Sequence, residues 1–444
     1  MAEYSMVNTN KNITELVKKL FPFGYSVTGS ENDRAAKLLQ QMLSFKFFEY
    51  PSGKELNGWV IPEGLKVQKA EIRKNGSLIY DAKKSPLGVP ALSESFEGQL
   101  TLEELTPHLF TADNTDAIPY HWMKLYRPDE KLWGFCIPKK IKDSLLPGNY
   151  KIELKTATYP SKMKVLVYTL QGKSNKKILI NAHNCHPYQA NDDLSGVAVG
   201  IEVMKSLSHN PERKYTYQLM VAPELFGPLF WLDEIGEEQA SSIIGTIMLK
   251  SVGNKRELRL QESFSGNSLL DRIAHQIFKL NYGEYKSGAF RTIYGNDETV
   301  FEAPPYRIPS ISLTRWPFVE YHTDQDTPEK LSEENLQDTV DTVLKICEGV
   351  EINKVYLPNF SGLVCLSRHN LYKPIPNIGD SGVDYNSNTG RWNQLMNGLP
   401  SCLDGDTDLL SISERYDLPF FEVAQYLDLW LEKNLLKEKD FKSN

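Results

Sequence analysis

Two histidines and two aspartates lie within eleven residues of one another, between positions 183 and 193. His183 ends an apolar run, His186 follows three residues later, and Asp192 and Asp193 precede a Ser-Gly pair. Imidazole nitrogens and carboxylate oxygens are groups that zinc binds in proteins, with one position left open for water. One such histidine alone would be read as a core or turn residue, and the aspartates as helix caps. The dense grouping instead predicts a metal site with His183, His186 and Asp192 as candidate ligands.

Two further candidates lie later in the chain. His322 follows an apolar segment and precedes Asp324 and Asp326, so it is expected as a ligand returned to the site from a distant segment. Glu224 follows another apolar run, where its carboxylate could act as general base. Taken alone, His322 and Glu224 also fit ordinary turn or surface positions. They are candidate site residues because the histidines and aspartates at 183–193 already predict a metal site.

From about residue 162 onward, strand-like segments alternate with helical ones, and these elements must position the candidate residues. A largely parallel sheet flanked by helices is the fold that such alternation predicts, and its ligand sites gather at strand ends. We expect an α/β fold with a mixed, largely parallel sheet. Apolar strand-like runs occupy 164–170, 176–183, 215–223, 241–250 and 307–315, and helical patterns occupy 196–210, 267–280 and 334–352.

The rest of the chain shows other patterns of predicted secondary structure. Two amphipathic helices are predicted within 11–50, and short β-like runs with turn signals fill 51–159, including the hairpin signal Asn75-Gly76. The predicted catalytic domain therefore comprises 1–50 and 160–355, with a nested β-rich domain over 51–159. A linker and a small helical, winged-helix-like domain are expected over 356–444.

Composition limits the classes of function. The 444 residues carry a net charge of −7, which gives no electrostatic reason to expect nucleic acid or an anionic membrane as a partner. The C-terminal stretch 404–437 has eight acidic and three basic residues, against a DNA-reading role. Five scattered cysteines, no signal-peptide pattern and no long apolar run predict a cytoplasmic protein.

The motifs, in this order, resemble the zinc aminopeptidase superfamily of co-catalytic metallopeptidases. A closer resemblance, over nearly the whole chain, is to a bacterial group of aminopeptidase-like proteins. This resemblance implies a zinc-exopeptidase-like fold, the nested β-rich domain, the winged helix and an association with polysaccharide or secondary-metabolite pathways. It also implies that Asp297, Glu298 and Tyr321 face the cleft and bind substrate, although 295–298 equally fits a polar turn. The superfamily match consists of His183, Asp192-Asp193-Leu194-Ser195-Gly196, Glu224, Tyr321-His322-Thr323 and Asp326-Thr327; the closer one consists of HNCHPYQANDDLSG, IPYHWMKLYRPDEKLWGFC, GNDETVFEAPPYRIPSISLTR and VEYHT.

Three positions depart from the aminopeptidase pattern. Pro223 replaces the first residue of a Glu-Glu pair, so Glu224 must serve as base or ligand, not both. Lys250 stands where a later aspartate ligand is expected, and its cation would repel a second metal. Cys185 stands where an aspartate usually orients the first histidine, so either His183 or His186 is the ligand and the other supports it. One zinc ion is therefore expected rather than two, as in the glutaminyl cyclases, a single-zinc branch of this fold.

Three functions remain open at this point. The leading hypothesis is a zinc-dependent aminopeptidase that hydrolyses an amide, with Glu224 as general base. A deacylase or amidase acting on an amino-sugar or small-molecule conjugate is the second, and a catalytically impaired binding or scaffold protein is the third. The expected partner is a small peptide or amide substrate, and the nested domain could shape the cleft or mediate a homo-oligomer.

Overall fold

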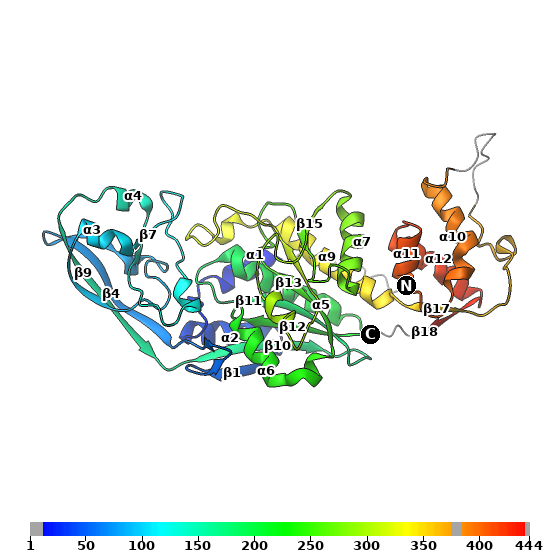
Figure 1. Cartoon of the computed structure of the whole chain (residues 1–444), viewed down its shortest axis with the longest axis horizontal. Helices are drawn as coiled ribbons and strands as arrows, with labels where there is room; N and C mark the ends of the chain where they lie inside the picture. Colours follow the sequence, from blue (N-terminus) through cyan, green and yellow to red (C-terminus); the bar gives the residue numbers. More distant parts are fainter. Residues whose placement is uncertain (1–11, 374–383, 440–444) are drawn as a thin grey trace. The chain divides into compact units, whose positions relative to one another are not determined.

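The computed structural model describes residues 12–373 and 384–439 (Figure 1). Contacts divide the chain into two compact units. The first comprises the chain up to 266 together with 286–341, and the second comprises 267–285 together with the chain from 342 onward. All of the predicted catalytic and metal-binding residues belong to the first unit. The domain boundaries expected at 51, 160 and 356 stay predictions.

An eight-stranded mixed sheet forms the centre of the first unit. Its four middle strands, β12, β11, β13 and β16, run parallel to one another. Strand β10 pairs antiparallel with β12, and β1 pairs antiparallel with β10 at that edge. The mixed, largely parallel α/β sheet expected from the sequence is confirmed. The strands in order across the sheet are β1 (Lys46–Pro51), β10 (Lys162–Leu170), β12 (Thr216–Ala222), β11 (Lys177–His183), β13 (Ile243–Leu249), β16 (Ser310–Thr314), β14 (Arg259–Gln261) and β15 (Lys286–Gly288).

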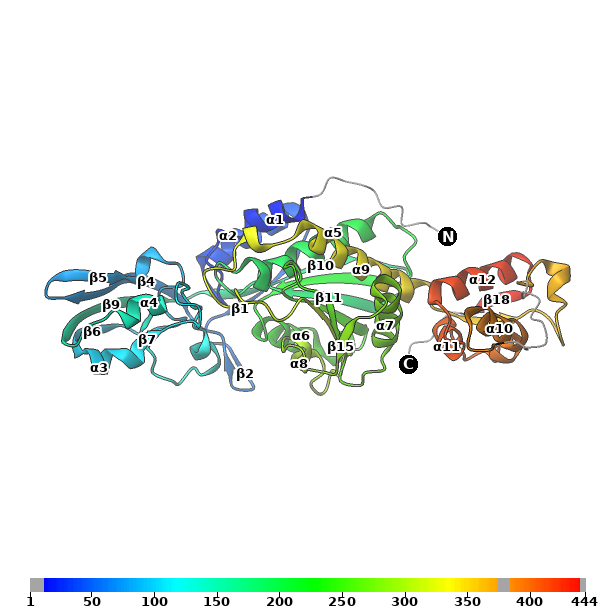
Figure 2. The same cartoon turned by 90° about the horizontal axis from the view of Figure 1, so that it is seen from above.

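The middle strands are buried along almost their whole length, because helices cover both faces of the sheet. Figure 2 shows α1 (Ile13–Leu20) and α5 (Gly196–Ser208) on one side, and α6 (Phe226–Ala240) and α8 (Glu298–Phe301) on the other. Helix α2 (Ser30–Met42) contacts β10. Continuous apolar strands with helical connections therefore place successive strand ends along one edge.

The segment predicted to be β-rich contains a four-stranded antiparallel sheet in the order β5-β4-β9-β6. Asn75 and Gly76 both have positive φ and join β4 to β5, as expected for a tight hairpin turn. Its own small core includes Ile72, Ile152 and Leu154. The elements are β2 (Glu55–Leu56), β3 (Trp59–Val60), β4 (Gly64–Lys74), β5 (Ser77–Asp81), β6 (Phe96–Thr101), α3 (Leu102–Leu105), β7 (Leu109–Phe110), β8 (Phe135–Cys136), α4 (Lys139–Asp143) and β9 (Asn149–Tyr159).

The second unit is mainly helical, with a two-stranded antiparallel sheet, β17 and β18. Arg272 on α7 forms an ion pair with Glu414 on α11, and Lys279 on α7 forms one with Asp417, two residues after α11. The winged-helix assignment stays a prediction. The elements are α7 (Leu269–Tyr282), β17 (Val355–Pro358), α10 (Asn388–Cys402), α11 (Leu409–Arg415), α12 (Phe420–Glu432) and β18 (Leu436–Lys439), and α9 (Glu333–Ile352) begins in the first unit and ends in the second. Among the described residues, no helix combines the length and apolar character needed to cross a membrane.

Candidate metal centre

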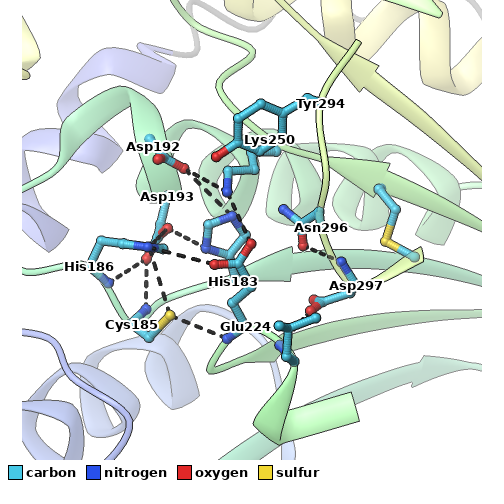
Figure 3. A network of polar contacts seen from close by, with 12 residues as sticks. His183, Cys185, His186, Asp192, Asp193, Glu224, Lys250, Tyr294, Asn296 and Asp297 are labelled. Atoms are coloured by element: carbon cyan, nitrogen blue, oxygen red, sulfur yellow. Dashed lines mark hydrogen bonds and ion pairs between the residues drawn. The ribbon is translucent and has the colours of Figure 1, made fainter. Parts of the chain in front are cut away.

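Side chains at the ends of three neighbouring strands, β11, β12 and β13, meet at one edge of the sheet (Figure 3). His183 is the last residue of β11, Glu224 follows β12 by two residues, and Lys250 comes directly after β13. His322 lies in the loop after β16. Parallel strands bring their carboxyl ends to a common edge, so residues far apart in sequence converge here. We call His183, His186, Asp192, Asp193, Glu224, Lys250 and His322 the metal-site cluster.

The loop between β11 and α5 brings four members of the cluster together. It makes a widened helical turn over Ala190–Ser195, and Asp192 within it has non-helical φ and ψ of −108° and 77°. Gly196 then starts α5 at a point where an added Cβ would lie 2.2 Å from the carbonyl oxygen of Leu249. The Ser-Gly pair is therefore explained by packing, because only glycine lets α5 begin this close to the end of β13.

Hydrogen bonds from two directions fix this loop. Ser195 Oγ donates to the carbonyl of Asn191 and accepts from the Val252 backbone N–H. The Asp326 carboxylate accepts from the backbone N–H groups of Asn191 and Asp192, at 2.8 and 3.0 Å. Asp326 thus anchors the metal-site loop to the segment that carries His322.

Asp193 orients both histidines of the loop. Its Oδ1 contacts His183 Nδ1 and lies 2.5 Å from His186 Nδ1. Its Oδ2 accepts the backbone N–H groups of Cys185 and His186, at 2.6 and 2.8 Å. Burial opposes ionisation of Asp193, but His183 and His186 outweigh it and hold its pKa well below the ordinary value. A carboxylate on Nδ1 directs the Nε2 atom of each ring away from Asp193, as in carboxylate–histidine–metal arrangements.

Asp192 faces the histidine Nε2 atoms. His183 Nε2 lies 3.6 Å from Asp192 Oδ1, and His322 Nε2 lies 3.2 Å from Asp192 Oδ2. These four buried atoms have no hydrogen-bond partner among the described residues. Two ligands of a tetrahedral zinc ion are about 3.4 Å apart, given bonds of roughly 2.0–2.1 Å. The spacing and the missing partners therefore fit a divalent ion between these side chains.

The two loop histidines also face Glu224. His186 Nε2 lies 3.7 Å from Glu224 Oε2, and the Glu224 backbone N–H donates to Cys185 Sγ at 3.2 Å. Candidate ligand atoms within 4.8 Å of one another form two overlapping groups, one with Asp192 and Asp193 and one with Cys185 and Glu224; both contain His183 and His186. The structure brings both histidines to the cluster, and which of them binds a metal ion stays a prediction.

Lys250 places a fixed positive charge inside the cluster. Its ammonium group lies 3.1 Å from Glu224 Oε1 and 3.5 Å from Asp192 Oδ1, and 4.2 Å from the centre of the Tyr294 ring. Burial disfavours the charged lysine, but Asp192 and Glu224 more than compensate and raise its pKa well above the ordinary value. Burial likewise opposes ionisation of Asp192 and Glu224, and the pKa of each is nevertheless lowered, chiefly by Lys250.

The charges of the cluster leave room for one divalent cation. Three carboxylates, Asp192, Asp193 and Glu224, face one ammonium group, so two negative charges remain. Burial opposes protonation of His183 and His186, but Asp193 raises the pKa of His183 to about 10 and that of His186 well above its ordinary value, so these rings carry the balancing charges until a divalent ion replaces their protons. A single divalent ion balances these two negative charges, and a second would leave an excess of positive charge in a buried site. Burial lowers the pKa of His322 to about 4, which keeps its ring neutral and available as a ligand.

Backbone strain surrounds the cluster. Four non-glycine residues of its loops, Tyr188, Leu225, Ser251 and His322, have φ between 51° and 61°. Such conformations cost about 1–3 kcal/mol each and cluster at functional sites. Here these four backbone conformations orient the loops that follow the strand ends, and so the side chains that those loops carry.

The three predicted substrate-binding residues lie in different surroundings. Asp297 is fully buried and accepts hydrogen bonds from Asn181 Nδ2 and the Leu225 backbone N–H, both at 2.6 Å. Glu298 is also fully buried and accepts the Asn296 backbone N–H. Burial raises the pKa of Asp297 to about 6 and that of Glu298 to about 7. Both carboxylates are buried, and Asp297 fixes the backbone next to Glu224; their contact with substrate stays a prediction.

Tyr321 is partly exposed beside the cluster. Its ring stacks on His322, with centroids 3.8 Å apart, and its hydroxyl lies 2.6 Å from that of Tyr294. Tyr321 thus supports His322, and its contact with substrate stays a prediction.

The β-rich segment reaches the cluster as well. The Tyr120 backbone N–H donates to the His322 carbonyl at 2.8 Å, and Asp324 exchanges two hydrogen bonds with Ile118. The Tyr120 ring lies 5.4 Å from both His186 and His322, edge-on to each. A cavity of about 400 Å³ lies elsewhere in this segment, beside Lys124 and Thr156, and contains no member of the cluster.

Sequence reasoning missed the roles of Asp193 and Tyr120. The repeated aspartate after Asp192, read together with Cys185 in place of an orienting carboxylate, was a signal for Asp193. Tyr120 gave no comparable signal, since its place depends on a contact between segments about two hundred residues apart.

Residues 14–353 match the family model described as "Domain of unknown function (DUF4910)". A curated relative from Clostridium acetobutylicum, named "Putative polysaccharide biosynthesis protein with aminopeptidase-like domain", is 27% identical over 434 residues, covering 97% of this chain and 96% of the relative.

Solved structures agree on the fold. The crystal structure of a "putative peptidase" from Clostridium acetobutylicum is 26% identical, with a TM-score of 0.79 and 96% of each chain covered. A zinc aminopeptidase from Bacillus subtilis has a TM-score of 0.59 at 16% identity, covering 76% of this chain and 93% of its own. The chain therefore shares the fold of a zinc aminopeptidase over 76% of its length.

Proposed function

The chain belongs to the DUF4910 family, and from its metal-site cluster we propose that it is a zinc-dependent hydrolase that cleaves an amide bond. The observation that carries this proposal is a set of buried atoms without a hydrogen-bond partner among the described residues: His183 Nε2 lies 3.6 Å from Asp192 Oδ1, and His322 Nε2 lies 3.2 Å from Asp192 Oδ2. His186 would complete the ligand set, because Asp193 orients its ring in the same way.

A zinc ion held there would polarise the scissile carbonyl and bring the pKa of water near about 7. The protein's own residues supply the rest. Glu224 is held ionised by Lys250, so its Oε2 is ready to take a proton and return it to the leaving amine. Tyr120 covers the histidines and excludes bulk water from their side of the cluster.

We propose one zinc ion per chain. Lys250 lies between Asp192 and Glu224, the carboxylates that would otherwise be available to a second ion. Its charge and the charge balance of the cluster both disfavour a second divalent ion.

The Glu224→Gln variant tests the chemistry directly. If Glu224 is the base, this nearly isosteric change leaves about one zinc per chain and lowers the rate of amide hydrolysis by about 10²–10⁴-fold. The measurements are zinc content by mass spectrometry and hydrolysis of a panel of peptides and N-acyl amides. Loss of zinc in the variant would make Glu224 a ligand instead.

The panel should include N-acylated amino sugars, since the name of the Clostridium relative refers to polysaccharide biosynthesis. A wild-type protein that binds no zinc and hydrolyses none of these amides would contradict the proposal and favour a binding or scaffold role.

A further inference from the structure

An enzyme that requires a free amino terminus must offer the substrate ammonium a negatively charged partner. Around the metal-site cluster, each described acidic group is already engaged or fully buried. Asp192 and Glu224 pair with Lys250, and Asp193 holds the histidines. Asp297 and Glu298 have no exposed surface. The acceptor that an α-ammonium needs is therefore missing among these residues.

Lys250 adds repulsion to this lack of attraction. Its ammonium is held between Asp192, Glu224 and the face of Tyr294, so it cannot swing away without leaving two buried carboxylates unpaired. A substrate ammonium next to these carboxylates would meet a like charge. Like charges placed together at a binding site disfavour the wrong ligand strongly.

Four partly exposed side chains next to the cluster are neutral and aromatic. Trp122, Tyr126, Tyr294 and Tyr321 are each partly exposed. Tyr321 stacks on His322, Trp122 lies 5.9 Å from His322, and Tyr126 stacks on Phe226, two residues from Glu224. Such a lining favours an uncharged, partly apolar group beside the scissile amide.

We infer that the substrate is an amide whose neighbouring nitrogen is acylated and uncharged, in the manner of an N-acyl conjugate, and not one with a free α-ammonium. This inference rests on the proposed function. Hydrolysis adds water across the amide C–N bond, with the hydroxyl going to the acyl carbon and a proton to the leaving amine. The inference therefore favours a deacylase or amidase function over an aminopeptidase function.

The test compares two ligands that differ only in acetylation of the α-nitrogen, which removes this charge. Zinc-loaded full-length protein is titrated calorimetrically with L-leucine hydroxamate, which carries a free ammonium, and with N-acetyl-L-leucine hydroxamate, which does not. We expect the acetylated ligand to bind at least about tenfold more tightly, because it avoids the charge of Lys250. Equal or tighter binding of the free amine overturns the inference while leaving the proposed function standing. Binding of neither ligand contradicts both.

Two variants assign the preference to Lys250. In Lys250→Met the ratio of the two dissociation constants should fall toward one. Lys164→Met is the matched control, because Lys164 also pairs with carboxylates, Asp33 and Glu49, but lies outside the cluster; its ratio should stay that of the wild type. An unchanged ratio in Lys250→Met would show that Lys250 does not set the preference. The wild-type comparison stands even if that variant fails to fold.

Discussion

Asp193 is the side chain on which the two loop histidines depend for their orientation. One of its oxygens contacts both rings and the other is held by two backbone N–H groups, so it cannot turn away without breaking four contacts. A carboxylate in this position fixes the tautomer and raises the basicity of a histidine ligand.

The Asp193→Asn variant should weaken zinc binding by about 10–100-fold, because the amide keeps the shape but loses the charge that holds both rings. Competition with a fluorescent chelator measures the affinity. Asp33→Asn, at a half-exposed residue paired with Lys164, serves as control and should match the wild type. Wild-type affinity in Asp193→Asn would remove Asp193 from the metal site.

At this scale the sequence predicted residue types better than roles. His183, His186, Asp192, Glu224 and His322 were all expected near a metal, and all five belong to the metal-site cluster; which of them bind an ion stays a prediction. The charge of Lys250 was also foreseen. The burial of Asp297 and Glu298 was not foreseen, because whether a carboxylate after a turn faces solvent or the core depends on packing. The resemblance placed both facing the cleft, and their contact with substrate stays a prediction.

The junction between β13 and α5 sets the position of the metal-site loop among the elements. Gly196 lies where the first turn of α5 touches the carbonyl of Leu249, and any side chain there would collide with backbone. The strand and helix types around this point were predictable because their apolar runs are long and regular. The close approach was not, since the sequence shows only a Ser-Gly pair that equally suits a turn.

Gly196→Ala should therefore destabilise the protein by about 1–3 kcal/mol, through displacement of α5 against the sheet. Chemical denaturation monitored by circular dichroism measures the change. Gly24→Ala is the comparison, because an added Cβ there meets its nearest neighbour at an ordinary 3.7 Å. Equal stability of the two variants would show that α5 can shift without cost.

For the molecule as a whole, the main finding is that the β-rich segment takes part in the site. Segment 114–120 runs beside 322–325 and is hydrogen bonded to it through Ile118, Tyr120 and Asn114. Composition and turn signals predicted the β-rich character of this segment. They carried no information on where it would pack, because that depends on tertiary contacts between distant parts of the chain.

Asp324→Ala tests this connection, since the Asp324 carboxylate accepts the Ile118 backbone N–H at 2.9 Å. Loss of the hydrogen bond should lower the free energy of unfolding by about 1 kcal/mol and speed amide hydrogen exchange at Ile118 and Tyr120. Asp116→Ala removes only an exposed ion pair with Lys140 and should change little. Unchanged exchange at Ile118 in Asp324→Ala would argue that the segment is held by other contacts.

The central claim is that one zinc ion binds among His183, His186, Asp192 and His322. Anomalous diffraction from crystals of the zinc-loaded protein, recorded on both sides of the zinc absorption edge, tests it most directly. The account predicts one strong anomalous peak per chain, close to the Nε2 atoms of the histidines and to the Asp192 carboxylate. No peak at the cluster, or a second peak at the place of the Lys250 ammonium group, would contradict it.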